Sequence, residues 1–222
     1  MQLAQEWPRT PEWRPPGMPE PDVPSRLPMV VPAVAAYESD LASRLLRRRI
    51  VLLTGRLDAA AAYDVVATLL LLDEDDHRPI RLHLSSSDVD LEAGTLLADT
   101  VDMLASPVHV VVLGAVGGVG LGVVASAADR AAHPQALLVL RDPQQSGALG
   151  AGDVDASRAA QLADQQQRLV ARLHQRIADV TGRPVEQVAA DMRAGRVLSA
   201  EEAVTYGLVQ RLASRSGTDG LD

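Results

Sequence analysis

Short apolar runs bounded by turn residues alternate along this chain with segments whose apolar residues recur at helical spacing. The runs that predict strands are Ile50–Leu53, Ile80–Leu84, Val108–Leu113 and Ala136–Leu140. The segments between them predict helices, one with Val65, Val66, Leu69, Leu70 and Leu72 on its face and ended by the acidic run 73–76, another over Glu92–Leu104. This alternation is typical of βα units around a buried, mainly parallel sheet, so we predict an α/β fold.

The second half of the chain predicts a long helix and a short capped one. Apolar residues at three- and four-residue steps predict one amphipathic helix over Ala156–Val180, whose stripe is long enough to need a partner. At residue 199 the sequence Ser-Ala-Glu-Glu fits a capping box, with Ser199 and Glu202 as the reciprocal pair. We expect Gly207 to end the helix that this box begins.

The first 32 residues differ from the rest, because they hold nine of the chain's 14 prolines and show no apolar periodicity. We therefore predict a disordered Pro-rich N-terminal arm over residues 1–32. The segment lacks the continuous apolar run of a secretory signal, so we expect a cytoplasmic protein. Residues 36–212 are expected to form one domain, followed by a short tail over 213–222.

Composition excludes several classes of function. The chain of 222 residues has a net charge of −8 and no basic run longer than residues 47–49, which argues against nucleic-acid binding. It contains no cysteine, which excludes disulfides and thiolate nucleophiles. No histidine pair has metal-ligand spacing, and the overall composition argues against a membrane span. We therefore expect no cofactor, no metal and no membrane partner.

A glycine-rich turn over Gly114–Gly122 lies between a predicted strand and a predicted helix that reaches Ala128. Such a turn invites a phosphate-binding interpretation. However, neither a complete G-x-G-x-x-G nor a G-K-[ST] ending can be read through it. We therefore expect these glycines to let the helix backbone pack closely against the sheet.

Two segments carry a resemblance to a known family. Residues 43–55, SRLLRRRIVLLTG, look like an opening helix and first strand, and residues 198–209, LSAEEAVTYGLV, are very similar to a C-terminal signature of the ClpP family. ClpP is a self-compartmentalised serine peptidase. The resemblance implies a ClpP/crotonase-like βα superhelix, in which the helix predicted over Ala156–Val180 is the handle between rings.

The resemblance also places the family's catalytic residues in this sequence. Its serine position corresponds to Gly118, its histidine position to Arg141 and its aspartate position to Asp191. The family's oxyanion turn corresponds to residues 86–89, with Asp88 and Val89 at the positions that would supply amides. If the alignment is right, the histidine and aspartate positions are neighbours, so we expect Arg141 and Asp191 to form an ion pair.

These replacements argue against peptidase chemistry. Glycine has no side chain to acylate, and the guanidinium of Arg141 stays protonated, so it cannot act as a base. Asp88 would oppose negative charge in the oxyanion hole, and none of the five histidines falls on a catalytic position. We therefore predict a ClpP-like subunit without serine peptidase activity of its own. Two alternatives stay open: an active serine-type endopeptidase with an unrecognised site, and a crotonase-like protein that binds acyl-CoA.

The resemblance further implies that the chain acts in an assembly. The family expectation is a ring of seven, formed by the chain alone or mixed with an active ClpP paralogue. The groove in which the partner AAA+ unfoldase docks is rich in aromatics in the family. Here its strand positions hold Arg81 and His83, with Met103 on the following helix, which does not favour docking of the usual unfoldase.

Overall fold

The structure, a computed structural model, describes residues 41–143 and 156–213. Its main sheet has five strands, all parallel, in the order β1 (Ile50–Thr54), β2 (Ile80–Ser85), β3 (Val108–Val112), β5 (Asp129–Ala132) and β8 (Arg211–Leu212). A second sheet joins β4 (Ala115–Gly117), β6 (Leu137–Val139) and β7 (Val197–Ser199). The predicted α/β fold with a mainly parallel sheet is confirmed.

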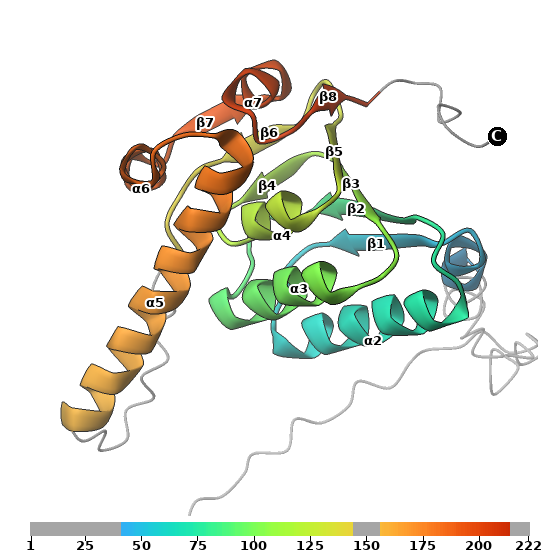
Figure 1. The fold of residues 1–222 in the computed structure, drawn as a ribbon, viewed down its shortest axis with the longest axis horizontal. Helices are drawn as coiled ribbons and strands as arrows, with labels where there is room; N and C mark the ends of the chain where they lie inside the picture. Colours follow the sequence, from blue (N-terminus) through green and yellow to red (C-terminus); the bar gives the residue numbers. More distant parts are fainter. Residues whose placement is uncertain (1–40, 144–155, 214–222) are drawn as a thin grey trace, which may run out of the picture. The chain divides into compact units, whose positions relative to one another are not determined.

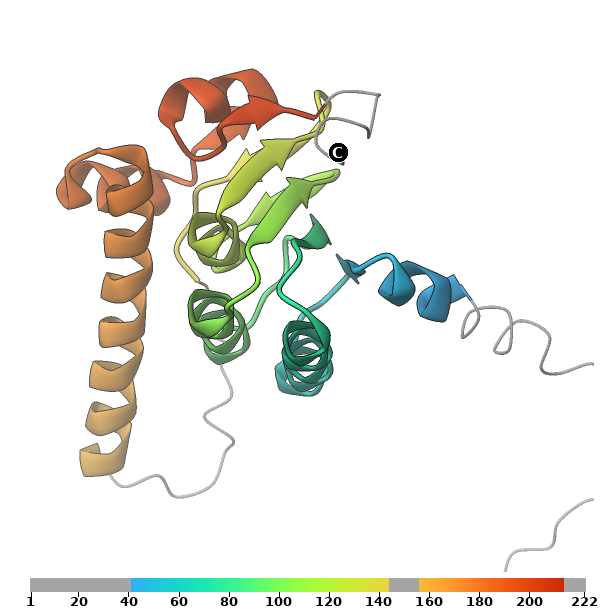
Figure 2. The same cartoon turned by 45° about the vertical axis from the view of Figure 1, so that its right-hand side comes forward.

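Three helices lie on one side of the main sheet: α2 (Ala59–Asp75), α3 (Leu91–Met103) and α4 (Gly120–Ser126) (Figures 1 and 2). Alternate strand residues such as Leu82, Leu84 and Val110 are fully buried. Their neighbours along the strands, including Arg81 and His83, are only partly buried. The hydrophobic core therefore lies on one face of the sheet, although parallel sheets are usually covered on both.

The C-terminal part forms α5 (Ala156–Thr181), α6 (Val185–Ala194) and α7 (Ala200–Tyr206). Figure 1 shows that the N-terminal half of α5 extends away from the sheets and the other helices. The buried residues of α5 all lie in its C-terminal half, where Leu173 and Ile177 pack into the core. Nearly every residue from 157 to 168 is exposed, and Leu162 is the single large apolar residue there. The expected apolar stripe thus covers only half of the helix.

Other expectations from the periodicity also need correction. Leu70 was expected on the buried face of α2 but is 50% exposed, because the buried positions Ala62, Leu69 and Leu72 lie on another side of the helix. The glycine-rich turn contains the short strand β4, and its helix ends at Ser126 instead of Ala128. The sequence reasoning missed β5, β7, β8 and α6, which are all ten residues or shorter.

The expected role of the glycines is confirmed for Gly120, which faces Val116 of β4, whereas Gly122 makes room for another helix instead of the sheet. A Cβ at Gly122 would lie 2.9 Å from a methyl group of Leu173 on α5, so the missing side chain lets α5 pack against α4. A Cβ at Gly120 would lie 3.1 Å from Val116. The predicted capping box is also present: the Ser199 hydroxyl accepts from the Glu202 amide, and the Glu202 carboxylate accepts from the Ser199 amide. Gly207 ends α7 with φ of 92°.

The expected Pro-rich arm, the segment 144–155 and all of the tail after Ala213 lie outside the described residues. Among the helices that the structure does describe, none combines the length and apolar character needed to cross a bilayer.

Candidate functional site

The candidate site lies where the strands β4 and β6 end, and we call Gly118, Arg141 and Ser87 the strand-end site. Gly118 follows β4 with φ of +54°, and its amide donates to the carbonyl of Val139 on β6. A Cβ built on Gly118 would lie 3.6 Å from the Arg141 carbonyl oxygen and 4.0 Å from the Arg141 Nε. The chain therefore brings the predicted serine and histidine positions side by side.

Arg141 directs its guanidinium to the loop after β2. Its Nη2 donates to the Ser87 carbonyl oxygen at 2.6 Å, and its Nε lies 3.9 Å from the position that a Cβ of Gly117 would take. The expected ion pair with Asp191 is wrong, since no contact of 4 Å or less joins these two residues. Asp142 and Asp191, the two carboxylates considered as partners for Arg141, each have another partner.

Asp191 near the end of α6 is held by two residues of the C-terminal segment. Its carboxylate accepts from the Tyr206 hydroxyl at 2.8 Å and pairs with Arg196 at 3.5 Å. The guanidinium of Arg183 lies 4.1 Å from the centre of the Tyr206 ring. We call these four residues the Asp191 cluster. Burial, together with the hydrogen bond and negative charge of Asp191, raises the pKa of Tyr206 to about 12.

Asp142, the residue after Arg141, pairs with a histidine. Its carboxylate lies 2.7 Å from Nε2 of His174, a buried residue of α5. The two consecutive side chains therefore reach different partners, as expected for an extended segment. A histidine with a carboxylate is half of a hydrolytic triad, but within the described residues no serine or threonine hydroxyl hydrogen-bonds to His174. The pair ties α5 to the end of β6.

The loop at the oxyanion-equivalent positions is fixed on one side. The Ser86 hydroxyl donates to the carbonyl of Gly55, and Leu57 forms a parallel bridge with Val89. The Asp88 carbonyl accepts from the Leu57 amide, while the Asp88 side chain is exposed. This carboxylate therefore stands on the loop whose carbonyl holds Arg141.

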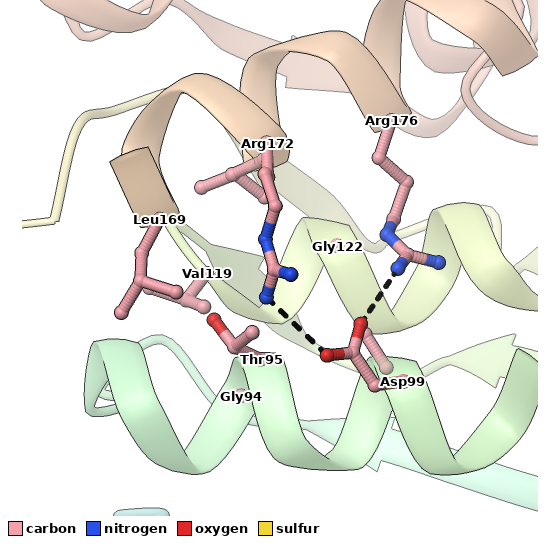
Figure 3. A pocket seen from close by; sticks show the side chains of 10 residues that line it. Gly94, Thr95, Asp99, Val119, Gly122, Leu169, Arg172 and Arg176 are labelled. Atoms are coloured by element: carbon pink, nitrogen blue, oxygen red, sulfur yellow. Dashed lines mark hydrogen bonds and ion pairs between the residues drawn. The ribbon is translucent and has the colours of Figure 1, made fainter. Parts of the chain in front are cut away.

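A small recess lies beside Val119, the residue after Gly118, between α3, α4 and α5 (Figure 3). Arg172 and Arg176 of α5 reach across it to Asp99 of α3, with N to O distances of 3.3 and 3.0 Å. The recess offers about 20 Å³, which is room for one water molecule. A bulky substrate side chain does not fit there.

The chemistry of this arrangement is limited. Serine-type hydrolysis needs a nucleophile, a neutral base and oxyanion donors, whereas the positions brought together here hold a glycine and an arginine. Within residues 41–143 and 156–213, no group of three or more histidine, aspartate or glutamate residues could hold a metal ion. The strand-end site can offer the partly exposed cation of Arg141.

Two pairings at the site escaped the sequence reasoning. Tyr206 lies inside the signature that carries the resemblance, but nothing in its spacing indicates that its hydroxyl reaches Asp191. His174 occupies a helical position next to Leu173, where a buried polar residue signals a partner. That signal was available, although it could not identify Asp142 as the partner.

Of the positions expected to dock an unfoldase, the two on β2 lie on the uncovered face of the sheet, and the third lies at the end of α3. Arg81 and His83 of β2 are partly exposed, and Met103 at the end of α3 is 83% exposed. Burial and the nearby charge of Arg81 lower the pKa of His83. Aromatic side chains are absent from these three positions.

The fold defines an α/β protein with a parallel main sheet and a second, three-stranded sheet. A sequence model of the Clp protease family matches residues 34–216, and the chain belongs to this family. It is 30% identical over 182 residues to the ATP-dependent Clp protease proteolytic subunit of Leuconostoc citreum, covering 80% of this chain and 89% of that protein.

Two further comparisons agree. The ATP-dependent Clp protease proteolytic subunit of Streptococcus gordonii is 30% identical over 195 residues, with 86% of this chain and 98% of that protein covered. A solved structure of a ClpP1 variant from Listeria monocytogenes superposes with a TM-score of 0.68 at 28% identity, covering 79% of this chain and 97% of that chain. The predicted family and fold are confirmed.

Proposed function

We propose that this chain is a Clp protease subunit without serine peptidase activity of its own, which acts in an assembly with itself or with an active ClpP paralogue. The observation that carries the proposal is the contact between Gly118 and Arg141. A Cβ at Gly118 would lie within 4.0 Å of the Arg141 side chain. The backbone thus suits a nucleophile beside its base, while the residues present supply neither group.

The Asp191 cluster supports the same proposal. A triad aspartate orients the histidine and stabilises its charged form. Here the Asp191 carboxylate is occupied by Tyr206 and Arg196, and the other candidate, Asp142, is occupied by His174. Neither of these two carboxylates is therefore free to orient a base at position 141.

The uncovered face of the main sheet supports assembly. On β1, Leu52 is 52% exposed, although it lies beside β2 in the middle of a parallel ladder. His83 and Val111 continue the same row across β2 and β3, and both are only partly covered. A parallel sheet usually has both faces buried, so a partner that covers this row would complete the fold.

A second uncovered apolar surface lies on α2. The exposed fractions are 64% for Tyr63, 50% for Leu70 and 66% for Leu71. This helix is therefore apolar on its outer side as well as toward the core, which is typical of a helix buried all round. Two different apolar faces favour a head-to-tail contact, and such contacts form closed rings when the rotation permits.

The activity is tested with fluorogenic peptides and the purified full chain. We expect no turnover above that of a mock purification, and none in the Gly118→Ser variant, because Arg141 cannot accept the proton. Turnover that follows the protein through every column would support an active endopeptidase instead. Binding of coenzyme A or an acyl-CoA in a calorimetric titration would favour the crotonase-like alternative.

Assembly is tested by sedimentation velocity at micromolar concentration, with the chain alone and co-expressed with ClpP paralogues of its host. We expect an oligomer, with a ring of seven as the family expectation. Leu52→Asp and Leu71→Asp each place a charge on one of the two surfaces, and each should lower the assembled fraction. A strict monomer in all these samples would contradict the proposal.

A further inference from the structure

Arg141 carries a positive charge that no carboxylate of the described residues neutralises at contact distance. Its hydrogen bond goes to the Ser87 carbonyl, which uses one of the five guanidinium N–H groups. Asp142 is taken by His174 and Asp191 by Tyr206 and Arg196. A guanidinium in this state has the donors for a bidentate bond to a carboxylate.

Two glycines border the side chain of Arg141. Gly117 and Gly118 lie beside it and present no side chains. A Cβ at Gly118 would be in ordinary van der Waals contact with Arg141, 3.6 Å from its carbonyl oxygen, so these two residues pack against each other on this side. Arg141 itself is partly exposed, which keeps the group within reach of solvent and a solute.

The adjacent loop offers a backbone edge. Val89 bridges Leu57 through the groups of its neighbours: the Asp88 carbonyl accepts from Leu57, and the Asp90 amide donates to it. The amide and carbonyl of Val89 therefore face away from Leu57, and within the described residues neither takes part in a backbone hydrogen bond. An extended peptide can pair with such an edge, whereas a small organic acid cannot.

We propose that the strand-end site binds the free C-terminal carboxylate of a peptide, with Arg141 as its anchor. The inference rests on the proposed function, because a site that hydrolysed peptides would release such ends. Asp88, exposed on the same loop, is the competing carboxylate.

The experiment compares two forms of one peptide by fluorescence polarisation. N-terminally labelled Gly-Ala-Val-Ala-Ala is prepared as the free acid and as the C-terminal amide, and each is titrated with the full chain. We expect the acid to bind at least tenfold more tightly. The net charge of −8 repels an anionic peptide, so overall electrostatics would give the opposite preference.

Four variants distinguish binding of the carboxylate by Arg141 from a general effect of the protein's charge. Arg141→Gln should remove the preference for the acid, Arg141→Lys should retain part of it, and Asp88→Asn should strengthen binding of the acid severalfold. Arg193→Gln removes an exposed arginine elsewhere, at the end of α6, and should leave the preference unchanged. If Arg141→Gln unfolds, the predicted stronger binding of the acid by Asp88→Asn still tests the inference.

Equal binding of acid and amide by the unmodified chain, no binding of either at millimolar peptide, or a preference that survives in Arg141→Gln would each overturn the inference. Mass spectrometry of the same samples detects cleavage of the labelled peptide. Cleavage would contradict the proposed function, whereas absent binding with an intact peptide would contradict only the carboxylate site.

Discussion

The strand-end site and the Asp191 cluster both flank the small three-stranded sheet, yet they differ in what holds them. At the strand-end site the hydrogen bonds all involve backbone groups. The Gly118 amide donates to the Val139 carbonyl, and the Arg141 side chain donates to the Ser87 carbonyl. In the Asp191 cluster the side chains hold one another, through a hydrogen bond, an ion pair and an arginine stacked on a ring.

The two regions therefore differ in the position of their backbone and in the side chains that they hold. The strand-end site places residues 118 and 141 side by side, but these residues are a glycine and an arginine. The Asp191 cluster contains a carboxylate of the right type, but its oxygens are committed to structural bonds. We therefore expect substitutions in the cluster to change the stability of the protein, and substitutions at the strand-end site to change what it binds.

The largest effect is expected for Tyr206→Ala in the Asp191 cluster. Tyr206 is 2% exposed, so truncation leaves a cavity. It also removes the hydroxyl that donates a hydrogen bond to Asp191. Loss of a buried aromatic side chain costs about 3–5 kcal/mol of unfolding free energy. Urea unfolding followed by far-ultraviolet circular dichroism measures the change, and a loss below 1 kcal/mol would show that the cluster is not a packed unit.

Tyr206→Phe isolates the hydrogen bond within the cluster. We expect the free energy of unfolding to fall by about 1 kcal/mol. This is the low end of the cost of leaving a buried acceptor without its donor, because Arg196 still pairs with Asp191. The pKa of Tyr206 is raised from 10 to about 12, so its contribution is present below pH 10 and is lost as the pH rises toward 12. Unfolding midpoints at pH 9, 10 and 11 should fall in the unmodified chain and fall less in Tyr206→Phe.

Gly118→Ser probes the backbone of the strand-end site. There is room for the new side chain, so the cost comes from its positive φ and should be about 1 kcal/mol. Gly195→Ser is the matched control, because Gly195 has φ of +68° and open space around it. Equal losses are expected; a much larger loss at position 118 would mean that the site is more tightly packed than its geometry indicates.

The smallest effect on stability is expected for Arg141→Gln. The side chain is partly exposed and makes a single bond to Ser87, so the unfolding free energy should fall by less than about 1 kcal/mol. Arg193→Gln serves as the surface control. A loss above 2 kcal/mol for Arg141→Gln would place this arginine with the structural residues and weaken the contrast between the two regions.

The sequence predicts the layers of the fold better than its short elements. Strands such as β2 and helices such as α5 have clear periodicity, and both were found within a few residues of their expected ends. By contrast β5 and β7 have three or four residues, which is too few for a period to show. Leu70 lies among four consecutive leucines on α2, so spacing could not tell which of them face the core.

The site divides in the same way. Residues 118 and 141 are neighbours in the structure because β4 and β6, the strands that precede them, pair in parallel. The family alignment fails for the ion pair of Arg141 with Asp191, since side-chain partners depend on competition. Tyr206 and Arg196 both bind the Asp191 carboxylate. The spacing of residues in the sequence does not indicate which of the possible partners forms the bond.

The most direct test of the central claim is active-site labelling. The purified full chain is incubated with a fluorophosphonate, and the mass of the intact protein is measured beside that of an active serine peptidase treated in the same way. The account predicts an unshifted mass for this chain and for Gly118→Ser, and a complete shift for the control enzyme. A stoichiometric adduct on any residue of the unmodified chain would contradict it.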